Sequence, residues 1–154
     1  MIFAVDTNLL IYAHNTASPY YKRAKQFTEK VMNERNAEGL LSVCLPSQVI
    51  TEFVHVITWR HLESPLSLKE AFQIVQDYLD SGIKIIFQQD TQIQTFISLS
   101  DMITARKKVF DVALAATLKD NHISGLYTNN IDDFKDFDFL TVINPLSDEE
   151  KEKA

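Results

Sequence analysis

The chain has 154 residues, of which 45% are hydrophobic and 23% charged. This is the composition of an ordinary globular protein, and the length fits a single domain. The formal net charge of −6 excludes a protein that coats nucleic acid through positive charge alone, because phosphate binding then rests on Lys and Arg. It leaves metal-dependent nucleases open, since a cluster of carboxylates attracts phosphate once it holds a cation.

Nothing in the sequence requires an oxidising compartment or a membrane. The single cysteine, Cys44, cannot form an internal disulfide and lies in an apolar stretch, so we expect a small buried side chain. The first residues lack the basic segment of a signal peptide. No apolar run approaches the roughly 20 residues that span a bilayer. The sequence therefore predicts a cytoplasmic protein.

The predicted elements alternate along the chain. Apolar runs that end at polar residues are typical of buried parallel strands, and apolar residues at helical spacing separate them. Ser47 is expected to cap one helix, and Ser67 with Glu70 forms the capping box of another, which ends near Gly82. In chain order, strands are expected at residues 2–5, 40–44, 83–87, 125–128 and 140–143, and helices at 9–12, 18–34, 47–59, 67–79, 92–103 and 109–119.

Strands separated by helices imply right-handed crossovers, and therefore an α/β fold with a parallel sheet of about five strands and helices on both faces. Residues 1–146 are expected to form this one domain, followed at 147–154 by a charged tail that frays in solvent. Ligands of such sheets bind beyond the carboxyl ends of the strands. Asp6, Asn130 and Asp133 follow the first and fourth predicted strands, so they are expected to share one edge.

Carboxylates occur in four separate regions. Asp6 follows the first strand, Glu52 lies on an apolar helix near its buried stripe, and Asp111 begins the Ala-rich helix at 109–119. Each also has a plain structural explanation: Asp6 as a helix N-cap, Glu52 as an edge carboxylate that reaches solvent, and Asp111 as a first-turn acid that suits the helix dipole. The polar turn at 128–134, which contains Asp133, could be an ordinary loop.

The four regions together are more informative than any one of them, because a parallel sheet would bring them to one place. Two carboxylates about 4 Å apart repel each other by roughly 4 kcal/mol at an effective dielectric constant near 20. Three or four ionised carboxylates therefore need a cation, and hard oxygen ligands with open positions select Mg²⁺ or Mn²⁺ rather than zinc.

The motifs resemble those of PIN domains, especially the VapC-type toxins of toxin–antitoxin pairs, whose fold is a three-layer α/β/α sandwich. The resemblance covers residues 1 to about 145, and the motifs come in the order of that family. The matching segments are residues 5–12 (VDTNLLIY), 47–53 (SQVITEF), 110–117 (FDVALAAT) and 127–134 (YTNNIDDF).

The resemblance implies roles for particular residues. Asp6, Glu52 and Asp111 would be catalytic, metal-binding acids, and Asp133 the fourth, as a direct or water-mediated ligand. Asn130 stands where many members of the family have an acid, so it is kept as an alternative. Thr7, Asn8 and, where it is not itself a ligand, Asn130 would lie next to the metal ligands without binding the metal, and Thr7 and Asn8 would orient Asp6. A plain capping role for Thr7 and Asn8 is the competing explanation.

The function implied by the resemblance is hydrolysis of RNA phosphodiester bonds by a Mg²⁺- or Mn²⁺-dependent endoribonuclease. Such a protein would act as the toxin of an antitoxin-controlled pair, as a homodimer. Bound metal ions would lower the pKa of a water molecule and stabilise the negative charge of the transition state.

Three other functions compete with this one. Glu52 and His55 have the Glu-x-x-His spacing of di-iron bundles, but those need a second copy and two more Glu-bearing helices. Phosphatases of the haloacid-dehalogenase kind also place Asp after the first strand, but they resemble Asp-x-Asp, and Asn8 stands at the third position here. A catalytically idle PIN-like scaffold that binds RNA or protein should have lost the acids.

Basic residues form one run of three, Arg106, Lys107 and Lys108, shortly before Asp111. These side chains could contact the RNA backbone, and Lys22, Arg23 and Lys25 could extend the track. A solvated helix end explains the run equally well.

Overall fold

The computed structural model describes residues 1–147, so the predicted tail, apart from Ser147, lies outside the described residues. Five parallel strands form one sheet in the order β3-β2-β1-β4-β5. The predicted α/β class and the five parallel strands are therefore confirmed. The strands are β1 (Phe3–Val5), β2 (Val43–Pro46), β3 (Lys84–Ile86), β4 (Gly125–Tyr127) and β5 (Thr141–Ile143).

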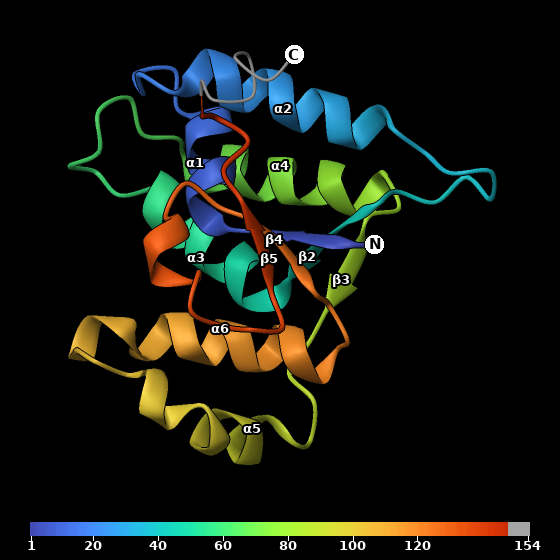
Figure 1. The fold of residues 1–154 in the computed structure, drawn as a ribbon. Helices are drawn as coiled ribbons and strands as arrows, with labels where there is room; N and C mark the ends of the chain where they lie inside the picture. The colour runs from blue at the N-terminus through green and yellow to red at the C-terminus, as the bar shows by residue number, and fades with distance from the viewer. Residues whose placement is uncertain (148–154) are drawn as a thin grey trace.

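The helices pack on both faces of this sheet. The chain steps from β1 to β2 to β3 in one direction and then crosses back over β1 to β4, so right-handed crossovers place α1 to α4 on one face and α5 and α6 on the other. Figure 1 shows α2 and α4 on one side of the strands and α5 and α6 on the other. The α-helices are α1 (Thr7–His14), α2 (Tyr21–Asn33), α3 (Ser47–Ile57), α4 (Leu68–Asp80), α5 (Gln92–Ser98) and α6 (Val109–Asp120), and short 3-10 turns are η1 (Ser100–Met102), η2 (Arg106–Lys108) and η3 (Ile131–Asp133).

Several predicted boundaries are wrong by a few residues. β2 begins at Val43, because the chain turns at Gly39 and residue Leu41 pairs back with Arg35 instead of continuing as a strand. Ser47 is the first residue of α3 and does not cap it; the N-cap is Pro46, which offers no side-chain acceptor. The helix predicted at 92–103 ends at Ser98 and continues only as the turn η1.

The predicted signals around α4 are confirmed. The Ser67 hydroxyl accepts from the backbone N–H of Glu70, and the Glu70 carboxylate accepts in return from the backbone N–H of Ser67. After Asp80 the chain reaches Gly82 with a φ of +82°, a left-handed conformation that glycine adopts without a steric penalty. Local interactions therefore define both ends of α4, the second helix of the crossover between β2 and β3.

The core lies on both sides of the three central strands. Ala4, Leu45 and Leu126 are fully or almost fully buried, and so is Cys44, as predicted. Gly125 packs against the ring of Phe3, and a Cβ at this position would lie 2.6 Å from a Phe3 ring carbon. A side chain at residue 125 would therefore displace the Phe3 ring, which packs across β1 and β4, the two strands that lead to Asp6 and Thr128.

Within residues 1–147, no helix is both long and apolar enough to cross a membrane.

Candidate active site at the carboxyl ends of β1 and β4

The site begins where two neighbouring strands end. In the parallel pair β1 and β4, Val5 is opposite Tyr127, so Asp6 and Thr128 leave the sheet side by side. The Tyr127 carbonyl accepts from the Asp6 N–H at 2.9 Å, and the Thr128 hydroxyl donates to Asp6 Oδ2 at 2.8 Å. The residues after β1 and β4 therefore lie at one edge of the sheet, as the crossover rules predict.

Asp6 is held at both carboxylate oxygens. It is the N-cap of α1, where the backbone N–H of Thr7 donates to Oδ1 at 2.8 Å, while Thr128 occupies Oδ2. Burial raises the pKa of Asp6 above its ordinary value, these two hydrogen bonds oppose the rise, and the charges of Glu52 and Asp133 add to it. Asp6 therefore caps α1 and also belongs to the cluster of acids, so its structural role and its role in the site do not exclude each other.

Glu52 lies on α3, but its predicted place near the buried stripe is wrong. The stripe consists of Val49, Phe53 and Ile57, and Glu52 is exposed because it precedes Phe53 by one residue, about 100° around the helix. Its carboxylate Oε2 accepts from the Thr7 hydroxyl at 3.1 Å. Glu52 therefore faces the start of α1 from the solvent side.

Asp111 joins the cluster from the first turn of α6, at the far side of the sheet. Its pKa is raised to about 6, first by burial and then by the charges of Asp133, Asp6 and Glu52, against which only Lys108 acts. Four acids from four different segments thus interact electrostatically with one another. A single cation, the Lys108 ammonium, partly balances their charge at Asp111.

The fourth position is filled by two polar residues after β4. Asp133, at the end of η3, raises the pKa of both Asp6 and Asp111. Asn130 is exposed, and its backbone N–H donates to the Thr128 hydroxyl at 3.0 Å. Of these two residues, only Asp133 carries a charge, and this charge interacts with the carboxylates of Asp6 and Asp111.

The two residues expected to orient Asp6 do different things. Thr7 binds Asp6 through its backbone N–H but directs its hydroxyl to Glu52, so it links two of the acids. Asn8 accepts from the backbone N–H of Asn129 at 3.4 Å and ties α1 to the loop after β4. Within residues 1–147, no hydrogen bond joins the Asn8 side chain to Asp6, so its predicted role in orienting Asp6 stays a prediction.

Thr128 is the site residue that sequence reasoning missed. It is fully buried, and its hydroxyl donates to Asp6 while accepting from Asn130. A buried hydroxyl needs a partner, because burying it without one costs about 1–3 kcal/mol. No local pattern indicates this contact, because it arises only from the parallel register, which places the residue directly after β4 beside the residue directly after β1.

The donor set suits a hard divalent cation, because all four side chains offer carboxylate oxygens. Hydrogen bonds hold the carboxylates of Asp6 and Glu52, whereas within residues 1–147 none holds those of Asp111 and Asp133. In this described part of the chain, no three His, Cys, Asp or Glu side chains are close enough to hold an ion as they stand. The four acids therefore do not form a closed coordination shell in this structure.

The predicted basic residues do not form one track. Arg106, Lys107 and Lys108 make up η2, beside the start of α6. Lys22, Arg23 and Lys25 lie on α2, on the other side of the strands (Figure 1). The run at η2 is therefore the part of the predicted track that adjoins the acids.

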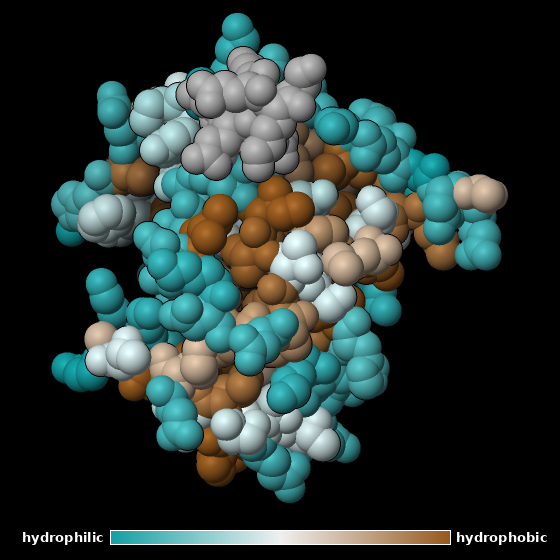
Figure 2. Space-filling model, viewed as in Figure 1, coloured by the Kyte–Doolittle hydropathy of each residue, from teal (hydrophilic) through white to brown (hydrophobic). Residues whose placement is uncertain are grey.

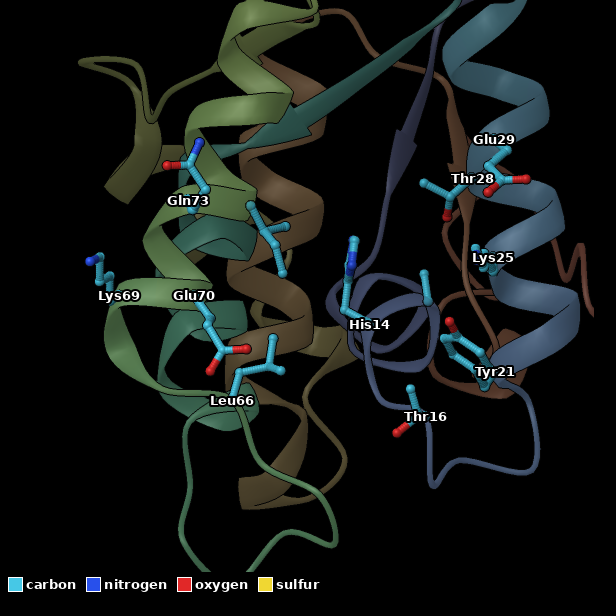
Figure 3. Close-up of a pocket in the computed structure, with 12 residues that line it drawn as sticks. His14, Thr16, Tyr21, Lys25, Thr28, Glu29, Leu66, Lys69, Glu70 and Gln73 are labelled. Atoms are coloured by element: carbon cyan, nitrogen blue, oxygen red, sulfur yellow. The ribbon is translucent and has the colours of Figure 1, made fainter.

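A separate groove of about 550 Å³ lies between α2 and α4, and none of the four acids lines it. Figure 3 shows Thr28 and Lys25 on α2 across the groove from Gln73 on α4, with His14 between the two helices. His14 Nε2 is 2.8 Å from the Tyr78 hydroxyl, and burial lowers the pKa of His14 to about 4. The buried Thr28 hydroxyl has no hydrogen-bond partner among the described residues.

Comparison with known proteins supports the resemblance in both sequence and fold. No family model matches the chain. The sequence is 25% identical over 147 residues to a protein named ribonuclease VapC24 from Mycobacterium tuberculosis, an alignment that covers 95% of this chain and 98% of the relative.

Solved structures of the same fold extend over nearly the whole chain. VapC20 of Mycobacterium tuberculosis, described as a toxin that cleaves the sarcin-ricin loop, has a TM-score of 0.63 at 14% identity and covers 85% of this chain and 92% of its own. VapBC2 of Rickettsia felis, solved with a promoter DNA fragment, has a TM-score of 0.61 at 19% identity, with coverages of 94% and 98%. A DNA-bound FitAB complex has a TM-score of 0.67 at 16% identity, with coverages of 95% and 96%.

The fold is that of PIN-domain proteins. Within this class, the resemblance to the VapC-type toxins is confirmed.

Proposed function

We propose that this chain is a Mg²⁺- or Mn²⁺-dependent endoribonuclease, a hydrolase of RNA phosphodiester bonds that works in the cytoplasm. The observation that carries the proposal is the convergence of four acids: Thr7 links Asp6 and Glu52 by hydrogen bonds, and burial together with the charges of Asp133, Asp6 and Glu52 raises the pKa of Asp111 to about 6. Four acids gathered at the functional edge of a parallel sheet destabilise a protein unless a cation offsets their repulsion. The sequence similarity to a ribonuclease supports RNA as the substrate.

The metal would be held by Asp6, Glu52, Asp111 and Asp133, with Asn130 as the alternative at the fourth position. When bound, it would supply a water molecule of lowered pKa and stabilise charge that develops on the phosphate. Thr128 and the Thr7 N–H fix the orientation of Asp6, and the Thr7 hydroxyl fixes that of Glu52. Lys108, next to Asp111, is placed to attract the phosphate backbone.

The direct test is cleavage of RNA by the purified chain with Mg²⁺, with Mn²⁺ and with EDTA. We expect cleavage with either metal and none with EDTA, and loss of cleavage in a folded Asp6→Asn variant. If the parent chain cuts no RNA with either metal, or if EDTA leaves the cutting unchanged, the nuclease proposal fails.

Thr128→Val tests the residue that holds Asp6, because valine keeps the volume of threonine and removes its hydroxyl. We expect the Mg²⁺ concentration for half-maximal cleavage to rise roughly 10- to 100-fold, as for other groups that orient a metal ligand. Thr128→Ser, which keeps the hydroxyl, should restore most of the affinity. A valine variant with unchanged metal dependence would show that the hydroxyl only fills a buried site.

We further propose that the chain is the toxin of a toxin–antitoxin pair and forms a homodimer. Several solved structures of this fold are toxin–antitoxin complexes. The groove between α2 and α4 is the surface we assign to the partner protein, because Ala13, Leu66 and Ile74 give it an apolar lining and charged side chains flank it. Its separation from the acids means that a partner segment could bind there without displacing them.

The assignment of the groove can be tested with two variants of the same helix. Ile74→Glu places a charge in the groove lining, and Phe72→Glu places one at an exposed position of α4 that does not line the groove. Burying an unpaired carboxylate is costly, so we expect the first variant to lose at least roughly tenfold in affinity for the protein encoded by the neighbouring gene. Equal losses in both variants would place the partner elsewhere. Sizing of the parent chain, alone and with that protein, tests the homodimer.

Two alternative functions can be tested with the same purified chain. A catalytically idle PIN-like scaffold would bind RNA or protein and cut nothing, with or without metal. A phosphatase of the haloacid-dehalogenase kind would hydrolyse small phosphomonoesters through Asp6. Its use of Asp6 as a nucleophile is disfavoured, because both carboxylate oxygens already accept hydrogen bonds.

A further inference from the structure

Phe110 is a large apolar side chain that the fold leaves in solvent at the margin of the acid cluster. It is the second residue of α6 and immediately precedes Asp111. The side chain is 75% exposed, whereas Val112 and the residues from Leu114 to Leu118 on the same helix are buried. Its exposure therefore does not come from a helix that lies loosely on the sheet.

The surroundings of Phe110 are polar and cationic. Arg106, Lys107 and Lys108 form η2 directly before α6, and they are the longest run of cations in a chain of net charge −6. From the other side, the Gln48 side-chain amide reaches the Phe110 backbone carbonyl at 3.5 Å. Gln48 lies one turn before Glu52 on α3, so the backbone of Phe110 lies between a cationic turn and the helix that carries Glu52.

These surroundings favour a nucleic acid over a protein as the occupant. The cores of protein–protein interfaces are depleted in lysine, whereas single-stranded nucleic acids are bound by cations that follow the backbone together with aromatic rings on which the bases stack. A more typical apolar surface lies over α5, where Ile93 and Ile97 are exposed and brown side chains gather at the lower end of Figure 2. Phe110 differs from these two side chains, because charged residues lie close to it in the sequence.

We infer that the Phe110 ring is the stacking platform for an unpaired base of a single-stranded RNA segment, adjacent to the phosphate that is cut. This rests on the proposed ribonuclease function and specifies its substrate as an unpaired segment. In an RNA duplex the bases are stacked on one another and cannot cover a protein ring. The cations of η2 would contact the backbone next to the stacked base.

The test measures binding rather than cleavage, with the full chain in an Asp6→Asn background and Mg²⁺ present. The probe is a short fluorescein-labelled single-stranded RNA, compared with the same sequence annealed to its complement. Phe110→Ala should weaken binding of the single strand roughly 5- to 150-fold, the usual contribution of one stacked base, and should leave the weaker duplex binding unchanged. Phe110→Trp should retain the affinity.

Two controls distinguish base stacking from a general apolar contact and from loss of charge. Phe110→Leu keeps an apolar side chain without a ring, so it should lose affinity as the alanine variant does. Phe72→Ala removes a ring that is 58% exposed on α4 and should change nothing. Phe110→Ala should also leave the salt dependence unaltered, whereas replacing Arg106, Lys107 and Lys108 by Ala should reduce the slope of log affinity against log salt by roughly 2.

The inference is overturned if Phe110→Ala binds the single strand as well as its parent does, or if Phe110→Leu keeps the affinity. It is also overturned if Phe110→Ala changes only the sedimentation of the protein, because the ring would then contact a second chain. If binding depends on Phe110 but the parent chain cuts no RNA with metal, the nuclease proposal fails alone. If metal-dependent cutting occurs without any dependence on Phe110, the stacking inference fails alone.

Discussion

Asp111→Asn is expected to abolish metal-dependent RNA cleavage and, at the same time, to stabilise the metal-free protein. Asparagine has nearly the volume of aspartate but carries no charge. Loss of a charged ligand removes several kcal/mol of transition-state stabilisation, so we expect the rate to fall by at least about 100-fold. Cleavage of a single-stranded RNA with saturating Mg²⁺ measures this loss.

The gain in stability has the same physical origin as the loss of activity. The pKa of Asp111 is about 6 because its charge is buried and faces three other acids. A shift of about two units corresponds to roughly 3 kcal/mol, which we reduce to about 1 kcal/mol because the side chain is only half-buried and solvent screens it. Thermal unfolding in EDTA at neutral pH should therefore show a Tm higher by roughly 2–4 °C.

Asp132→Asn is the matched control for this prediction. Asp132 is exposed and pairs with Lys135 at 3.1 Å, outside the cluster of interacting acids. It should leave cleavage unchanged and alter stability by less than about 1 kcal/mol. If Asp111→Asn lowered the Tm in EDTA, Asp111 would be a stabilising first-turn acid of α6 instead of a strained member of the cluster.

Most of the fold could be predicted from sequence because local chemistry and topology agree. The capping box at Ser67 and the glycine at 82 define α4, and strands alternating with helices lead to one parallel sheet. The boundaries of β2 were wrong because the apolar pattern there continues through a turn, whereas the start of α3 at residue 47 was right and only its end, at Ile57, came two residues earlier than predicted. Packing of the turn, which no local pattern reveals, decides where the strand begins.

The candidate site was predictable in its acids but not in their supports. Asp6 and Asp111 follow from their place after a strand and at the start of a helix. The exposure of Glu52 was not predictable, because one residue of helix rotation separates the buried stripe from the solvent side. The contacts of Thr128 and Asn8 join residues more than a hundred positions apart in sequence, which only the register of β1 and β4 brings together.

Relative to a folded Asp111→Asn variant, the metal-free parent chain is expected to lose stability as the pH rises from about 4 to about 6, and Mg²⁺ should restore it at higher pH. In this range the folded state keeps a proton on Asp111, with a pKa of about 6, while the unfolded chain, with an ordinary value of 3.8, has released it. At this residue the folded state therefore binds more protons, and its contribution to the free energy of unfolding falls with increasing pH. Asp6 acts in the same direction, because burial raises its pKa as well. His14 acts in the opposite direction, because burial lowers its pKa to about 4, and it is present in both chains, so the comparison with the variant isolates Asp111.

Mg²⁺ reverses this trend because it binds the ionised acids of the folded state only. At a concentration 100 times its Kd it should add about 2.7 kcal/mol to the free energy of unfolding, or roughly 5–11 °C in Tm. The effect should fade below about pH 5, where the acids must release protons before they can bind metal. NaCl at matched ionic strength should give only a small increase, since it screens the acids without bridging them. A difference in Tm between the two chains that is flat between pH 4 and 7, in a parent chain that is indifferent to Mg²⁺, would mean that the four acids do not share one site. The four acids would then be independent carboxylates, and their position near the ends of β1 and β4 would be unrelated to catalysis.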